Sequence, residues 1–178
     1  GGGQGGHTRG PARLRRDKDM VAPDGMAVQL VDTSWACYVT PGHTPGTVST
    51  LIPLRDGRDE HVGVVWGGIN PSLERYGVRY YDSLKETLET WSASAARMRR
   101  IARDAHADVY LTLHPFYDNA LDKIHAVAYR DPHQAHPLVS SKNLDNVLTI
   151  IEECTRAQLA RLKAGPGTAG RRTASGGR

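Results

Sequence analysis

A histidine in a rigid loop is the feature of this sequence best suited to chemistry. His43 lies at the centre of residues 40–46, which read TPGHTPG. Proline fixes the φ angle and glycine permits positive φ, so two of each predict a tight turn with little conformational freedom. A histidine ring that is held before a ligand arrives is suited to bind a metal ion. The alternative is a turn whose histidine only hydrogen-bonds its neighbours.

A second histidine also follows an apolar run. His114 comes directly after residues 108–113, which we expect to form a short strand. The sequence contexts of five other histidines favour a structural or surface role: His61, His106, His125, His133 and His136.

The elements around His43 are predicted to be short strands. Apolar runs alternate with turn signals at residues 26–32, 35–39, 48–54 and 61–66. Four short strands joined by tight turns predict a mostly antiparallel sheet, with His43 between the second and the third.

The rest of the chain predicts helices. Residues 83–106 begin with a Ser-x-x-Glu capping box and carry apolar residues at three- and four-residue spacing. A second helix is expected from Asp118, as its cap, through Tyr129, and a third from Ser141 to Lys163. This order predicts an α+β fold in which the helices cover one face of the sheet and the other face has no partner in the sequence.

Composition indicates one globular domain. The chain has 178 residues, 39% of them hydrophobic, and a net charge of +4. Residues 1–20 carry a net +3 and residues 163–178 a net +4, which leaves residues 21–162 at −3. We therefore expect a folded part at 13–163 between a disordered Gly-rich segment at 1–12 and a disordered basic tail at 164–178. Because the basic residues lie at the ends, a nucleic-acid surface is not expected.

Several smaller features complete the expectations. No run of 18 apolar residues exists, so no membrane span is expected, and the chain shows neither a starting Met nor a signal-peptide pattern. Cys37 and Cys154 are predicted to be buried free thiols. Residues 97–100 (RMRR) favour a solvated helix face over a phosphate site.

These motifs together resemble the metallo-β-lactamase superfamily, and within it the third subclass of class B β-lactamases. The resemblance runs from about residue 16 to residue 162. Three motifs carry it in the family's order: residues 40–46, residues 64–68 (VVWGG) and residues 113–115 (LHP). The closing helix also resembles this subclass.

The resemblance implies an αβ/βα sandwich of two halves with two zinc ions between them. This chain would supply mainly the C-terminal half, one sheet with its helices. His43 would correspond to the third histidine of the first zinc site, and His114 to the last histidine of the second. The family's other ligands belong to an HxHxDH motif of the first half, and that motif does not occur in this sequence.

The implied activity is hydrolysis of the β-lactam amide by zinc-bound hydroxide, in a periplasmic or secreted enzyme. A catalytic zinc takes three protein ligands, so one ligand per metal predicts that this chain alone is inactive, as a fragment or a degenerate relative. Apart from the metal ligands, no catalytic residue is identifiable.

The residues after the VVWGG motif bear on the substrate. Residues 69–72 (INPS) contain no acid, which by resemblance favours the lactamase subclass over thioesterases and lactonases. Asn70 or Ser72 would bind the substrate carboxylate, although turn formation explains both equally well. The alternatives are a metallo-hydrolase of the same fold acting on a thioester, lactone or ester, and a non-catalytic domain that self-associates through its uncovered sheet face.

Overall fold

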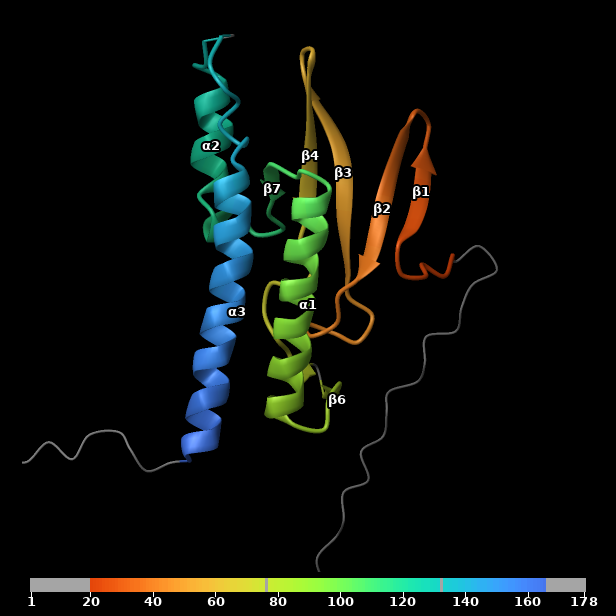
Figure 1. The fold of residues 1–178 in the computed structure, drawn as a ribbon, viewed down its shortest axis with the longest axis vertical. Helices are drawn as coiled ribbons and strands as arrows, with labels where there is room; N and C mark the ends of the chain where they lie inside the picture. Colours follow the sequence, from red (N-terminus) through yellow and green to blue (C-terminus); the bar gives the residue numbers. More distant parts are fainter. Residues whose placement is uncertain (1–19, 76, 132, 166–178) are drawn as a thin grey trace, which may run out of the picture.

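The computed structural model describes residues 20–75, 77–131 and 133–165, which form a main sheet flanked by helices and a small two-stranded sheet (Figure 1). The predicted disordered segment at 1–12, and residues 166–178 of the tail predicted at 164–178, lie outside the described residues. Residue 164, which we placed in the tail, belongs to the last helix.

The main sheet has five strands in the order β1-β2-β3-β4-β7. They are β1 (Met26–Leu30), β2 (Thr33–Val39), β3 (Val48–Asp56), β4 (Asp59–Val65) and β7 (Val109–Leu111). The first four pair antiparallel, and β7 pairs parallel to β4, which confirms the mostly antiparallel sheet. Since neighbouring antiparallel strands alternate in direction, β2, β4 and β7 all run the same way.

One face of this sheet forms the core. Leu51, Val64 and Tyr110 lie in register across β3, β4 and β7, and all three are buried. They pack in one cluster with apolar side chains of α1 (Leu84–Asp104). The row on the opposite face, at Thr50, Val65 and Leu111, is only half-buried.

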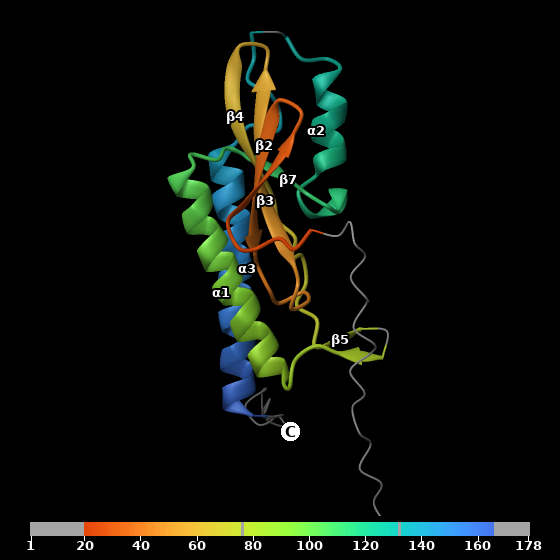
Figure 2. The ribbon, with the colours of Figure 1, turned by 90° about the vertical axis from the view of Figure 1, so that its right-hand side faces the viewer.

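Helix α1 and the last helix, α3 (Ser141–Ala164), lie on the same side of the sheet (Figure 2). The capping box is confirmed in part: the Ser83 hydroxyl accepts the N–H of Glu86 at 3.1 Å, but the Glu86 carboxylate accepts the N–H of Asp82. Helix α3 ends before Gly165, whose φ of 71° is readily adopted by glycine.

The middle helix differs from the prediction. Helix α2 is shorter, Ala120–Val127, follows a 3₁₀ turn, η1 (Pro115–Tyr117), and lies on the opposite side of the strands from α1 and α3 (Figure 2). Asp118 does not cap it. Its buried carboxylate pairs with Lys123 at 2.8 Å, and Asn119 occupies the cap position with a φ of 55°. A carboxylate buried this deeply needs a cation beside it, because an unpaired buried charge is strongly destabilising.

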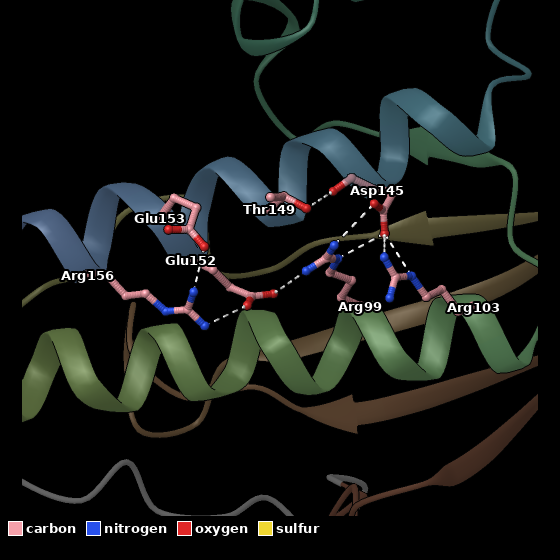
Figure 3. A network of polar contacts seen from close by, with 7 residues as sticks. All are labelled: Arg99, Arg103, Asp145, Thr149, Glu152, Glu153 and Arg156. Atoms are coloured by element: carbon pink, nitrogen blue, oxygen red, sulfur yellow. Dashed lines mark hydrogen bonds and ion pairs between the residues drawn. The ribbon is translucent and has the colours of Figure 1, made fainter.

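The arginines at 97–100 do not form the solvated face that we predicted, because Arg97 pairs with Asp24 and Arg99 pairs with acids of α3. Arg99 of α1 contacts Asp145 at 2.9 Å and Glu152 at 3.4 Å, both on α3 (Figure 3). Arg103 reaches the same Asp145 at 2.7 Å. This network links the two helices through charged groups. Hydrogen bonds from Arg99 also lower the pKa of the Asp145 carboxyl.

Two smaller expectations can be compared with the structure. Both cysteines are free, but the prediction that both are buried is wrong: Cys37 is half-buried on β2 and Cys154 is exposed on α3. Among the described residues, no helix is long and apolar enough to cross a membrane.

Candidate functional site

Three loops meet at one edge of the sheet. Because β2, β4 and β7 are parallel to one another, the segments that follow them leave from the same edge. These segments carry His43, Asn70 and His114 respectively. Topology therefore gathers at one edge all the loops that the sequence pattern singled out.

The His43 loop is closed by its own hydrogen bonds. The N–H of Thr40 donates to the carbonyl oxygen of Thr47 at 2.8 Å, and the N–H of Thr44 donates to the Thr47 hydroxyl at 2.9 Å. The buried hydroxyls of Thr40 and Ser49 lie 2.7 Å apart. Backbone and side-chain groups of the loop thus satisfy one another, as expected of a rigid turn.

Helix α1 fixes the position of this loop. The Ser94 hydroxyl donates to the carbonyl oxygen of Pro41 at 2.7 Å. Gly42 has a φ of 135°, and a Cβ atom there would lie 2.6 Å from the Cα of Trp91. Only glycine satisfies both the backbone angle and this contact.

The strand that leads into the loop is fastened as well. Asp24 accepts the N–H of Val39, the last residue of β2, at 2.9 Å and pairs with Arg97 of α1 at 2.6 Å. Arg97 also donates to the carbonyl oxygen of Val39 at 3.0 Å. The Val39 N–H, together with Arg97, lowers the pKa of the Asp24 carboxyl.

The ring of His43 is oriented by two contacts. Its Nδ1 lies 2.6 Å from the carbonyl oxygen of Asn70. A carbonyl oxygen only accepts, so Nδ1 carries the proton and Nε2 keeps its lone pair. The guanidinium of Arg75 donates to that Nε2 at 3.3 Å.

Arg75 comes from an element that the sequence analysis did not predict. A small hairpin, β5 (Glu74–Arg75) and β6 (Val78–Arg79), follows the Asn70 loop. Gly77, with a φ of 73°, was the available turn signal. The hairpin places a positive charge beside the nitrogen through which His43 would bind a ligand.

His114 lies in a more open setting. It precedes η1, is exposed, and its ring contacts those of Phe116 and Tyr117 at centroid distances of 5.7 Å and 6.1 Å. Its main chain hydrogen-bonds to Thr112, but the structure gives its ring no hydrogen bond to another described residue.

The two residues proposed to contact substrate lie beside His43. The carbonyl oxygen of Asn70 binds His43, and its side-chain oxygen accepts the Tyr117 hydroxyl at 3.1 Å. The N–H of Ser72 donates to the carbonyl oxygen of Gly42 at 3.0 Å. Asn70 thus connects the His43 loop to the segment that carries His114.

The described residues do not complete a metal site. Within residues 20–75, 77–131 and 133–165, no group of three or more His, Cys, Asp or Glu side chains is placed to hold a metal ion. The orientation of His43 suits a ligand, since metal-binding histidines commonly donate their other N–H to a carbonyl. The donor set as a whole is too small for tightly bound zinc.

Another histidine has a partner elsewhere in the fold. His61, at the opposite end of β4, contacts the carboxylate of Asp108 through Nδ1 at 2.6 Å. The other oxygen of Asp108 accepts the N–H of Val62 at 3.1 Å. This arrangement joins the starts of β4 and β7, in keeping with the predicted structural role of His61.

The fold is similar to that of solved metallo-β-lactamases. BJP-1, a subclass B3 enzyme of Bradyrhizobium japonicum, superposes with a TM-score of 0.64 at 24% identity, over 82% of this chain and 52% of its own. FEZ-1 from Legionella gormanii gives a TM-score of 0.63 at 21% identity, over 80% and 51%. A metallo-β-lactamase from Cronobacter sakazakii gives 0.58 at 24% identity, over 82% and 52%.

Comparison of sequences gives no further match: no family model and no curated protein matches this chain. The chain spans about half the length of the solved structures that it resembles, with 52% of BJP-1 covered. The resemblance inferred from residues 40–46, 64–68 and 113–115 is confirmed at the level of the fold. The protein has the mixed sheet and helices of the metallo-β-lactamase fold, over about half of that fold's length.

Proposed function

We propose that the complete protein is a zinc-dependent hydrolase of the metallo-β-lactamase fold that opens the amide bond of β-lactams. This chain would supply His43 to one zinc ion and His114 to the other, and the remaining ligands would come from outside it. Bound zinc would supply a hydroxide near neutral pH and polarise the carbonyl group. Since the described residues do not complete either site, this chain alone is expected to be inactive.

One observation carries the proposal. The carbonyl oxygen of Asn70 lies 2.6 Å from Nδ1 of His43, which leaves Nε2 as the nitrogen for a ligand at the edge where three loops meet. Metal-binding histidines commonly donate their other ring N–H to a carbonyl oxygen in this way, which fixes the tautomer and the orientation of the ring. Asn70 and Ser72 remain the proposed contacts for a substrate carboxylate.

The test is His43→Ala in the complete protein. We expect zinc content and cephalosporin hydrolysis to fall by more than about tenfold, because the first zinc ion would lose a ligand. His125→Ala is the matched control, since His125 is an exposed histidine of α2 away from this edge. Unchanged zinc content and rate would remove His43 from the site.

Substrate class is the finer part of the proposal. The absence of an acid in residues 69–72 supports a β-lactam over a thioester, lactone or other ester. A panel of one substrate of each class, turned over by the complete protein, separates them. Preference for an ester by more than tenfold would replace the lactamase assignment and keep the hydrolase.

Exposed apolar side chains favour a second candidate, a non-catalytic pairing domain. Three apolar side chains on η1 and α2 are each more than half exposed: Phe116, Leu121 and Ile124. The row of Thr50, Val65 and Leu111, on the sheet face opposite α1, is only half-buried. A second copy could cover these side chains. Two measurements distinguish the candidates: sedimentation of this chain, and the zinc content and turnover of the complete protein. A dimer of this chain, together with neither zinc nor turnover in the complete protein, would favour pairing over catalysis.

A further inference from the structure

A tyrosine that the sequence analysis did not connect to His43 reaches it through one residue. Tyr117 lies in η1, three positions after His114. Its hydroxyl donates to the side-chain oxygen of Asn70 at 3.1 Å. The main-chain carbonyl oxygen of the same Asn70 accepts Nδ1–H of His43 at 2.6 Å. Two hydrogen bonds therefore join the segment after β7 to the loop after β2.

Asn70 depends on such contacts for a fixed position. It is exposed and lies in the segment between the end of β4 and the hairpin, outside any strand. An exposed loop residue is held by its hydrogen bonds more than by packing. The bond from Tyr117 restrains the side chain of Asn70. Because the main-chain carbonyl of Asn70 is joined to that side chain, its position is restrained as well.

We propose that Tyr117 is a positioning residue that acts through Asn70 to hold the His43 ring in the Nδ1–H tautomer, with Nε2 presented at the sheet edge. This proposal rests on the proposed function only in treating His43 as a metal ligand at the sheet edge. The tautomer itself is a property of this chain, and no metal ion is needed to observe it.

The contact with Arg75 agrees with this assignment. A guanidinium has only donors, so its 3.3 Å approach to Nε2 of His43 requires that nitrogen to accept. Nδ1 must then carry the proton, as the contact with Asn70 also requires. Weakening the support of Asn70 would loosen the stronger of these two contacts, and the ring would sample the other tautomer.

The experiment is nitrogen-15 NMR of the His43 ring in the 178-residue chain at about pH 8, where an ordinary histidine is neutral. Tyr117→Phe keeps the aromatic ring and removes the hydroxyl. We expect the ratio of Nδ1–H to Nε2–H tautomer to fall by about twofold to tenfold, the range that the loss of one hydrogen bond supports. Tyr129→Phe is the matched control, because Tyr129 is 91% exposed and should leave the ratio unchanged.

A second variant tests the route. Asn70→Ala removes the acceptor for Tyr117 and keeps the main-chain carbonyl, so it should lower the ratio as Tyr117→Phe does. The double variant should change it no further, since both substitutions break the same contact. An unchanged ratio in Tyr117→Phe, an equal change in Tyr129→Phe, or additive effects in the double variant would each overturn the proposal.

These outcomes are independent of the test of function. If zinc content of the complete protein does not depend on His43 while the tautomer ratio responds to Tyr117, the proposed function fails and the positioning role stands. If zinc content depends on His43 while the ratio ignores Tyr117, the reverse holds.

Discussion

The two histidine segments at the sheet edge are held to very different degrees. The His43 loop is closed by internal hydrogen bonds, packed on Trp91 of α1, and fastened at its entrance by Asp24 and Arg97. The His114 segment is exposed, and its ring lies against the neighbouring aromatic rings of η1, with no hydrogen bond to another described residue. This chain therefore preorganises one of its two candidate ligands and leaves the other to be positioned by something else.

The largest expected effect on stability comes from disrupting the packing of the His43 loop against α1. Gly42→Ala would place a Cβ atom 2.6 Å from the Cα of Trp91 at a φ of 135°. We expect the free energy of unfolding to fall by about 3 kcal/mol, since steric overlap and an unfavourable backbone angle add. Urea denaturation measures it. Gly46→Ala is the control, because nothing lies within 4 Å of its added Cβ; equal losses at both positions would contradict the packing account.

Acid should next weaken two ion pairs of α1, one with Asp24 at the entrance of the His43 loop and one with Asp145 of α3. Contacts with Val39 and Arg97 lower the pKa of Asp24, and contacts with Arg99 and Arg103 lower that of Asp145. An aspartate whose pKa is lower in the folded than in the unfolded state stabilises the fold at pH values above its ordinary pKa of about 3.9. This contribution is lost as the pH falls through the pKa of the folded state. The free energy of unfolding should therefore fall as the pH is lowered from about 5 through the ordinary aspartate pKa of about 3.9, and should go on falling below it.

A charge-removing variant checks the origin of that loss. Asp145→Asn should be less stable than the parent chain near neutral pH and show a shallower decline with acid. A decline of equal slope in the variant would assign the acid sensitivity to other groups.

The smallest effect is expected on the His114 side. Phe116 is 76% exposed beside His114, so Phe116→Ser should change the free energy of unfolding by less than about 0.5 kcal/mol. Thermal unfolding followed by circular dichroism measures it. A loss above about 2 kcal/mol would mean that this segment is packed as firmly as the His43 loop.

Sequence patterns predicted the elements with strong local signals. The four strands, the long helix at 84–104 and the last helix at 141–164 were expected within a few residues, because alternation, capping and helical spacing act locally. The two histidine loops were placed at strand ends for the same reason. Their meeting at one edge follows only once β7 is known to pair parallel to β4.

Contacts between distant side chains could not be predicted. Arg97 and Arg99 read as a solvated basic run, because their acidic partners Asp24 and Asp145 lie far away in the sequence. Asp118 resembled a helix cap, but a buried ion pair with Lys123 takes its place. The hairpin that brings Arg75 to His43 has two-residue strands, too short for any periodicity to indicate.

The central proposal is that this chain carries part of a zinc site and not a whole one. Its most direct test is the zinc content of the pure 178-residue chain, measured by atomic emission after loading with excess zinc and dialysis. Because each metal would find one ligand here and needs three, we predict less than one zinc ion per chain. One or two tightly held zinc ions per chain would contradict the account.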